Sequence, residues 1–204
     1  QRHVDRRGRP HAFDRVEPST TAFVVVDMVP FFVDANPFCE AILPTVVDLA
    51  IACRSVGGLV AWVVPASVGL PAGRREFFGD TVADRYEASG GPGAAEHRVA
   101  RRLRPDADDL FVEKRTPSAF FPGGSVLHDR LSTRGVDTIV VAGTVANVCV
   151  ESTVRDAATL GYRVIVAADA VAAISDDDLN ASLRTIHRSF ADVRPSAEIV
   201  GLLG

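Results

Sequence analysis

The chain of 204 residues carries a formal net charge of -4, and 47% of its residues are hydrophobic and 24% charged. This composition is typical of one soluble globular domain with a sizeable core and argues against a disordered chain. The acidic balance, and the lack of an apolar stretch long enough to cross a bilayer, give no reason to expect nucleic acid or a membrane as a partner.

The chain opens with a basic segment, QRHVDRRGRP, that contains Arg2, Arg6, Arg7 and Arg9. It lacks the apolar core of a secretory signal. We expect residues 1–18 to form an N-terminal basic arm on the surface, which could pack on a partner subunit. Residues 19–204 are expected to form a single domain.

Short apolar runs alternate with helical patterns along this domain. The runs cover residues 22–26, 59–64, 110–112, 138–142, 164–167 and 198–202. Most are continuous, as in strands buried on both faces of a parallel sheet. Between them, apolar residues step by three and four, from Ile42 to Cys53 and from Leu179 to Phe190, which indicates amphipathic helices. The alternation predicts an α/β fold, a Rossmann-like three-layer α/β/α domain with a six-stranded, mainly parallel sheet.

Residues 65–92 interrupt the alternation with an insertion rich in glycine, arginine and aromatic residues. A connection from a strand to a helix is normally much shorter in such a fold. The insertion could be a plain surface excursion. It could also be a lid, because ligands bind at the carboxyl ends of the strands, where long loops gather.

Three cysteines, Cys39, Cys53 and Cys149, are an odd number in a chain with no visible export signal. This argues against a disulfide framework and favours the reducing cytoplasm. The five histidines do not stand in pairs with metal-ligand spacing, so we expect no metal and no cofactor. Cys53 falls on the apolar stripe of its helix and is expected in the core, whereas Cys39 could either pack or border a site.

Three reactive side chains follow predicted strands. Asp27 comes after residues 22–26, Lys114 after residues 110–112, and Cys149 in the segment GTVANVC after residues 138–142. Since the carboxyl ends of parallel strands meet at one edge, a carboxylate, an amine and a thiol could lie together there. Each also has a plain alternative: a cap of a turn for Asp27, a solvated surface residue for Lys114 and a small core residue for Cys149.

The sequence around each group suggests how it would ionise. Cys149 is expected in the first turn of a helix that starts near Ala146 or Asn147, with Asn147 as its cap, where the helix dipole lowers the pKa of a thiol. The free N–H groups of that turn could hold an oxyanion. Asp27 lies among apolar residues, so its pKa is expected to be raised, as suits a base that works near neutrality. Lys114, the only lysine of the sequence, is its natural counter-ion.

These residues and their surroundings resemble the isochorismatase-like hydrolase superfamily, in its cysteine hydrolase or amidohydrolase branch. The resemblance runs over nearly the whole domain, through TAFVVVDM, EKRTPSAFFPG and AGTVANVCVESTVRDAATLGYRVIVAADA. It implies Cys149 as the nucleophile, Asp27 as the base that takes its proton and Lys114 as the cation that orients both.

The resemblance implies three further features. The peptide bond between Thr144 and Val145 is expected to be cis, with the backbone N–H groups of Val145 and Cys149 forming the oxyanion hole. The protein is expected to form a homo-oligomer, a dimer or a tetramer.

Nicotinamidases of the family bind a metal through an Asp-x-His pair after the second strand, where this chain reads AWVVPASVGL. True isochorismatases have glycine at the position of Cys149, so the retained cysteine favours covalent acyl chemistry.

The sequence therefore predicts a metal-independent cysteine hydrolase that cleaves a C–N bond of a small carboxamide or ureido compound through a thioester. The expected substrate contacts are four aromatic residues and one arginine: Phe31, Phe32, Trp62, Phe120 and Arg115. The aromatic residues could equally be core residues, and Arg115 could face solvent. Two alternatives stay open, an isochorismatase-like enol-ether hydrolase with Cys149 as a bystander and a non-catalytic binding protein on the same fold.

Overall fold

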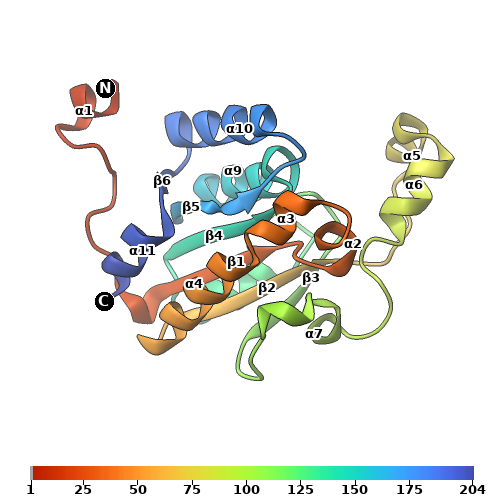
Figure 1. The fold of residues 1–204 in the computed structure, drawn as a ribbon, viewed down its shortest axis with the longest axis horizontal. Coiled ribbons are helices and arrows are strands. Elements are labelled where there is room, and N and C mark those ends of the chain that lie inside the picture. Colours follow the sequence, from red (N-terminus) through yellow and green to blue (C-terminus); the bar gives the residue numbers. More distant parts are fainter. Residues whose placement is uncertain (1) are drawn as a thin grey trace.

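A computed structural model describes residues 2–204 and contains one six-stranded sheet in which all neighbouring strands are parallel. The strands are β1 (Thr21–Val26), β2 (Leu59–Pro65), β3 (Leu110–Lys114), β4 (Thr138–Thr144), β5 (Arg163–Ala172) and β6 (Asp192–Arg194). Their order is β3-β2-β1-β4-β5-β6, so β1 and β4 lie at the centre (Figure 1). The predicted α/β fold with a parallel sheet is confirmed.

Helices cover both faces of the sheet. On one face lie α4 (Leu43–Ser55) and α11 (Ser196–Leu203), and on the other lie α8 (Leu127–Ser132), α9 (Glu151–Thr159) and α10 (Asp176–Ser189). The shorter helices are α1 (Arg2–Arg7), α2 (Pro30–Val33), α3 (Pro37–Ala41), α5 (Ala72–Phe78), α6 (Asp80–Glu87) and α7 (Ala95–Arg98), with 3-10 turns η1 (Pro18–Thr20) and η2 (Arg101–Leu103). Nowhere in residues 2–204 does a helix combine the length and the hydrophobicity that crossing a bilayer requires.

The central strand β1 separates two hydrophobic cores. Its side chains point alternately to opposite faces of the sheet. Phe23 and Val25 therefore pack with α4 and α11, whereas Ala22, Val24 and Val26 pack with the helices of the opposite face. All six residues of the strand are buried, which explains why its sequence is continuously apolar.

The prediction of a strand at residues 198–202 is wrong. These residues belong to α11, and the sixth strand is the shorter β6 just before it. Within α11, Ile199 and Leu203 are buried four residues apart, while Val200 between them is exposed. A short apolar run does not distinguish a strand from a helix, and here the burial has the spacing of a helix.

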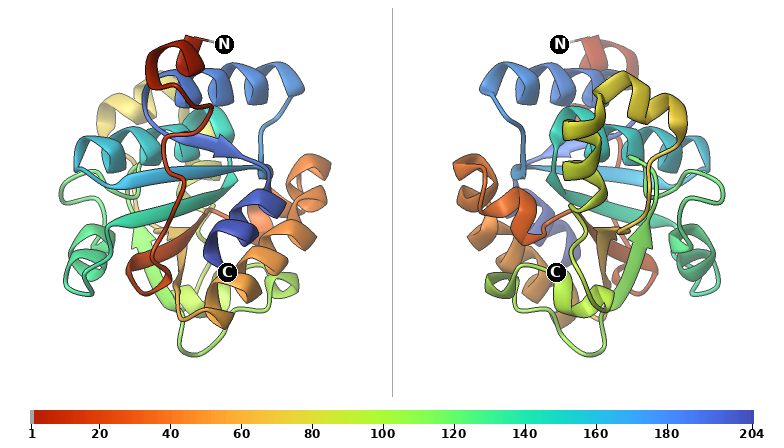
Figure 2. Two further views of the ribbon diagram at one scale, coloured as in Figure 1. Left: turned by 90° about the vertical axis from the view of Figure 1, so that its left-hand side faces the viewer. Right: turned by 90° about the vertical axis from the view of Figure 1, so that its right-hand side faces the viewer.

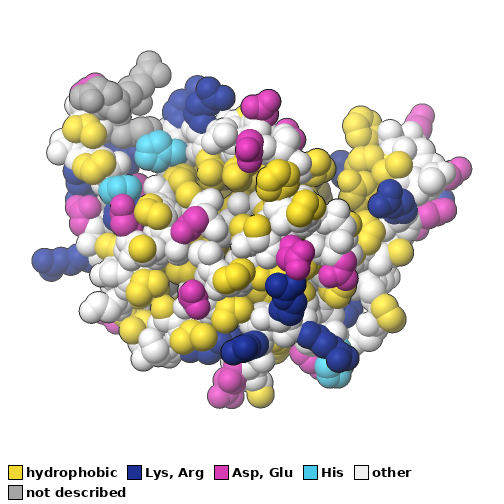
Figure 3. All heavy atoms as spheres, in the orientation of Figure 1, with side chains coloured by type: hydrophobic (Ala, Val, Ile, Leu, Met, Phe, Trp, Pro, Cys, Tyr) yellow, Lys and Arg dark blue, Asp and Glu magenta, His cyan; other side chains and the backbone are white. Residues whose placement is uncertain are grey.

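The insertion after β2 contains α5 and α6, which stand apart from the sheet at one side of the molecule (Figures 1 and 2). Arg75 on α5 links the two helices, because it forms ion pairs with Asp80, Asp84 and Glu87 at 3.0, 2.6 and 3.1 Å. Hydrophobic side chains gather on both sides of the hollow between the insertion and the body of the domain (Figure 3). The insertion thus forms one wall of a hollow.

The N-terminal segment runs along the side of the domain past β6 (Figure 2). The buried carboxylate of Asp192 accepts hydrogen bonds from the backbone N–H groups of Ala12 and Phe13, at 2.7 and 3.0 Å. Arg194 donates a hydrogen bond to the carbonyl oxygen of Phe13 at 2.6 Å. Part of the expected basic arm is therefore bonded to the last strand of the same chain.

Candidate active site

Asp27 directly follows β1 at the centre of the sheet and is fully buried. Its backbone N–H donates a hydrogen bond to the carbonyl oxygen of Val63 on β2 at 2.8 Å. Its φ of 55° is left-handed, a conformation that aspartate tolerates better than most residues. The chain thus leaves the sheet immediately after placing a carboxylate at the carboxyl edge of β1.

Lys114 is the last residue of β3, and it is also buried. Its Nζ lies 2.8 Å from Oδ2 of Asp27. The same nitrogen donates hydrogen bonds to the carbonyl oxygen of Thr116 at 3.1 Å and to Sγ of Cys149 at 3.5 Å. One ammonium group therefore contacts both the carboxylate and the thiol.

Cys149 lies in the first turn of the helix that follows β4, as the sequence predicts. This turn is π-helical, η3 (Ala146–Val150), and it continues directly into α9. The predicted cap is wrong, since the N-cap is Val145 and no side chain caps this end, while Asn147 is exposed. Cys149 as a whole residue is only half-buried, but its sulfur is enclosed by the surrounding protein.

The path from β4 to the cysteine depends on Gly143. This glycine has a φ of 114°, and a Cβ atom built on it would lie 2.1 Å from the carbonyl oxygen of Val26. Only glycine lets β4 pass so close to the end of β1. The peptide bond between Thr144 and Val145 is cis, at the place that the family resemblance implies. The hydroxyl of Thr144 lies 3.1 Å from Sγ of Cys39.

The three reactive groups influence each other's ionisation. Burial raises the pKa of Asp27, and the neighbouring Lys114 ammonium offsets this effect only in part. Burial lowers the pKa of Lys114, but Asp27 and Cys149 together raise it by more, so it lies above its usual value. Burial and the Asp27 carboxylate raise the pKa of Cys149 to about 12.

The expectation of a lowered pKa for Cys149 is therefore wrong. Loss of solvent around the sulfur and the negative charge of Asp27 outweigh the Lys114 ammonium, which acts in the opposite direction. At neutral pH Cys149 therefore rests as a thiol and Lys114 as an ammonium. A nucleophilic sulfur at this place consequently needs a proton acceptor, and Asp27 is the carboxylate beside it.

A cavity of about 430 Å³ opens beside Thr144 and Val145, at the start of the helix that carries Cys149. Its lining is mostly aromatic and aliphatic and does not include the three reactive side chains. Phe31 and Phe32, two of the expected substrate contacts, line it. Their rings stand nearly perpendicular, with centroids 4.9 Å apart. The cavity therefore borders the N-cap residue of the helix that carries Cys149.

The other three expected substrate contacts lie outside this cavity. Trp62 is 1% exposed, packs in the core on the α4 face and donates a hydrogen bond from Nε1 to Asp109 at 2.6 Å. Phe120 is buried in the opposite core, with its ring 5.2 Å from that of Tyr162. Arg115 is exposed. Trp62 and Phe120 are therefore core residues and Arg115 is exposed, because closeness in sequence to a reactive residue does not show which way a side chain points.

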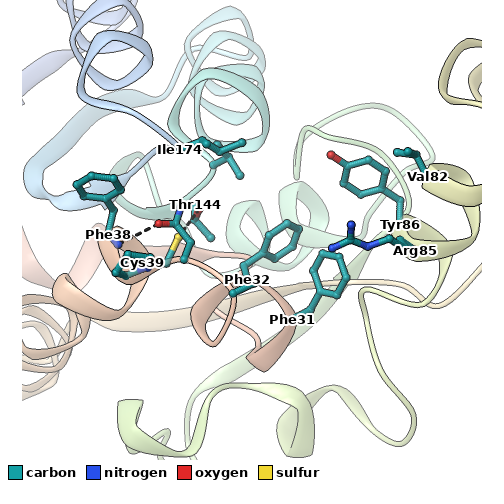
Figure 4. A pocket seen from close by; sticks show the side chains of 13 residues that line it. Phe31, Phe32, Phe38, Cys39, Val82, Arg85, Tyr86, Thr144 and Ile174 are labelled. Carbon is teal, nitrogen blue, oxygen red and sulfur yellow. Dashed lines mark hydrogen bonds between the residues drawn. The ribbon is translucent and has the colours of Figure 1, made fainter.

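The insertion contributes to the cavity. Val82, Arg85 and Tyr86 of α6 line one side of it, and Phe38, Cys39 and Thr144 lie on the other side (Figure 4). From the sequence, residues 65–92 could be a plain surface excursion or a lid, and their aromatic and arginine content includes residues that line the cavity. Cys39, left undecided from the sequence, is buried beneath the cavity.

Two further acidic residues near strand ends have structural partners. Glu113 forms an ion pair with Arg98. Asp169 accepts hydrogen bonds from the backbone N–H of Ser196 at 2.8 Å and from its hydroxyl at 2.6 Å, at the start of α11. Across residues 2–204, no group of three or more His, Cys, Asp or Glu side chains is placed to hold a metal ion.

Comparison with known families agrees with this architecture. The family model described as the isochorismatase domain matches residues 21–198, which is most of the chain. The chain therefore belongs to the isochorismatase family, as the resemblance implied.

Similarity to individual proteins is moderate. The chain is 40% identical over 95 residues to the uncharacterized isochorismatase family protein YecD of Escherichia coli O157:H7, a match that covers 47% of this chain and 50% of that protein. It is 30% identical over 178 residues to the ureidoacrylate amidohydrolase RutB of Pseudomonas savastanoi pv. phaseolicola, covering 76% of this chain and 72% of that one. The matches to the first two curated relatives thus span only about half of those proteins.

Two solved structures share the whole architecture. A cysteine hydrolase from Pseudomonas syringae pv. phaseolicola superposes with a TM-score of 0.83 at 28% identity, over 96% of this chain and 97% of that one. The N-carbamoylsarcosine amidase from Thermoplasma acidophilum gives a TM-score of 0.72 at 30% identity, over 87% of this chain and 96% of that one.

Proposed function

We propose that the protein is a cysteine amidohydrolase that cleaves a C–N bond of a small carboxamide or ureido compound through a thioester intermediate. The observation that carries the proposal is the position of Nζ of Lys114, 2.8 Å from Asp27 and 3.5 Å from the sulfur of Cys149. The proposed acid-base group and the proposed nucleophile thus share one ammonium neighbour, and this positive charge favours the ionised form of the carboxylate.

In the first half of the reaction, Asp27 takes the thiol proton of Cys149 while the sulfur attacks the substrate carbonyl carbon. The carbonyl oxygen gains negative charge, and the backbone N–H groups of Val145 and Cys149 are the proposed donors that stabilise it. The C–N bond then breaks, and the proton held by Asp27 passes to the departing nitrogen. A thioester on Cys149 and a free amine or ammonia result.

In the second half, Asp27 accepts a proton from a water molecule that attacks the thioester carbonyl. The carbon–sulfur bond breaks, the new carbon–oxygen bond remains in the acid product, and the proton returns to the sulfur of Cys149. Lys114 stays positively charged throughout, since its pKa lies above the usual value. Its role is to hold the Asp27 carboxylate in its ionised form.

The named relatives support the choice of bond. Ureidoacrylate amidohydrolase and N-carbamoylsarcosine amidase are amide hydrolases by their names, and this chain is similar to both over most of its length. Each name also describes a compound with a ureido or carbamoyl group. We therefore place small ureido compounds first among the candidate substrates.

The proposal is tested by replacing the sulfur. Ammonia release from a panel of small carboxamides and ureido compounds should be abolished in Cys149→Ala, and intact-protein mass should reveal an acyl adduct on wild-type protein after rapid quenching. Cys53→Ala is the matched control, because Cys53 lies buried in the core, and it should keep full activity.

The two alternatives give different results in the same assays. Hydrolysis of an isochorismate-like enol ether that survives Cys149→Ala would make the cysteine a bystander. A wild-type protein that releases no ammonia from any compound of the panel, and that forms no acyl adduct on Cys149, would indicate a binding protein.

A further inference from the structure

The cavity beside Thr144 and Val145 contains one charged side chain among its lining residues, that of Arg85 on α6. The remaining walls are mainly hydrocarbon, with Phe31 and Phe32 between Arg85 and Thr144 (Figure 4). The guanidinium group of Arg85 extends toward these two rings rather than away from them (Figure 4). The guanidinium group of Arg85 thus lies on one side of the two phenylalanine rings, and Thr144, which leads to Cys149, lies on the other side.

The positive charge of Arg85 is not neutralised within the described chain. The acidic residues closest to it in sequence, Asp84 and Glu87, are both bound by Arg75, at 2.6 and 3.1 Å. Arg75 also binds Asp80, at 3.0 Å, so it uses all three carboxylates of α6. No carboxylate of residues 2–204 forms an ion pair with Arg85. The guanidinium group therefore remains available to an anion that enters the cavity.

We propose that Arg85 selects substrates that carry a carboxylate at the end remote from the scissile amide or ureido group. This inference rests on the proposed amidohydrolase function and narrows its substrates to acids. A guanidinium group binds a carboxylate through two parallel hydrogen bonds, which fixes the orientation of the ligand as well as its charge. The reacting carbonyl would then lie toward Val145, with the body of the substrate against Phe31 and Phe32.

The surroundings of Arg85 strengthen such a contact. Arg85 is itself exposed, and the aromatic and aliphatic residues beside it would remove a bound carboxylate from part of the surrounding water, so the attraction would be screened less than between two groups on an open surface. Tyr86 follows Arg85 on the same helix and also lines the cavity, and its hydroxyl offers a further hydrogen-bond donor. Arg115, which the sequence suggested for this role, lies outside the cavity lining.

The test compares an acid with its neutral amide. Binding of 3-phenylpropionate and of 3-phenylpropionamide is measured by calorimetry on the Cys149→Ala protein, which removes turnover from the measurement. We expect the acid to bind about tenfold or more tightly than the amide, and Arg85→Gln to weaken the acid about tenfold to a hundredfold while leaving the amide unchanged. Arg74→Gln is the matched control, since Arg74 has the same charge on the same insertion but stacks on Phe78 instead.

The results separate this inference from the function on which it rests. Equal binding of the acid and the amide, or an acid affinity that Arg85→Gln leaves unchanged, would overturn the role of Arg85 whether or not amides are hydrolysed. Loss of acid binding in Arg85→Gln, with Arg74→Gln normal, supports it even if the panel of carboxamides and ureido compounds shows no ammonia release. In active protein, the same substitution should raise KM for acidic substrates and leave that for neutral amides unaltered.

Discussion

Nζ of Lys114 and Oδ2 of Asp27 lie 2.8 Å apart although β2 separates the strands that carry them. Both side chains are buried, at 4% and 1% exposure. The ion pair thus spans the width of a whole strand at the carboxyl edge of the sheet. Removing one member leaves the other as an uncompensated buried charge, so either group alone is costly.

The two members of this pair act on the thiol with opposite signs, which gives the first prediction. Asp27 raises the pKa of Cys149 and Lys114 lowers it. Asp27→Asn should therefore lower the thiol pKa below its value of about 12, and Lys114→Met should raise it further. The rate of Cys149 alkylation by iodoacetamide across pH, followed by intact-protein mass, measures both shifts.

In these variants, kcat/KM should not rise and fall with the fraction of Cys149 that is ionised. Asp27→Asn gains thiolate but loses the proposed proton acceptor, so kcat/KM should fall by about 10² to 10⁴. Shifts of the alkylation profile in the same direction for both substitutions would contradict the proposed electrostatic roles.

The second prediction concerns the pH dependence of hydrolysis. Burial raises the folded-state pKa of Asp27 above its ordinary value of 3.8, and the proposed base must be ionised to act. Activity should therefore be lost as pH falls, with a midpoint above that of an ordinary aspartate. A kcat/KM profile that stays flat down to pH 4 would exclude Asp27 as the base.

The third prediction tests the close approach of β4 to β1. Gly143→Ala would bring a Cβ atom to 2.1 Å from the backbone of Val26, at a φ of 114°. We expect a loss of at least about 2 kcal/mol in the free energy of unfolding, with reduced activity because Asp27 follows Val26. Gly201→Ala is the control, since nothing lies within 4 Å of that position in α11, and it should be neutral or stabilising.

Cys39 provides the fourth prediction. Its sulfur lies 3.1 Å from the buried hydroxyl of Thr144, the residue before the proposed oxyanion donor Val145. Cys39→Val leaves that hydroxyl without this partner and should cost about 1–3 kcal/mol of unfolding free energy and lower kcat. Cys39→Ser keeps a polar partner and should retain more of both. Equal stability and equal kcat in the two variants would show that this contact is dispensable.

A fifth prediction concerns Trp62, which the structure places in the core. Trp62→Phe removes the hydrogen bond to Asp109 and should lower the free energy of unfolding by about 1–3 kcal/mol. KM for every substrate should stay within about twofold, because the side chain lies outside the cavity lining. A selective rise in KM would restore Trp62 as a substrate contact.

The positions of Asp27, Lys114 and Cys149 at strand ends could be predicted, because a parallel sheet aligns all carboxyl ends at one edge. Their ionisation could not, since it depends on how completely the sulfur is removed from water and how close the Asp27 carboxylate lies. The same limit applies to Arg85. Arg85 has no ion-pair partner among the described residues because the nearby carboxylates of Asp84 and Glu87 pair with Arg75 instead. No sequence pattern shows that pairing. The expected homo-oligomer and cytoplasmic location remain predictions.

The hydrogen bonds between Asp192 and the backbone of Ala12 and Phe13 tie the two ends of the chain into one unit. The buried carboxylate of Asp192 lies 3.4 Å from Arg194 and 3.7 Å from Arg7, and its amide donors come from a segment about 180 residues earlier. Proteolysis just before Ala12 would keep the amide donors and remove only Arg7, whereas cleavage between Phe13 and β1 would free the donors and leave Arg194 as the remaining partner of the buried carboxylate. A shortened protein that is meant to fold should accordingly begin no later than His11.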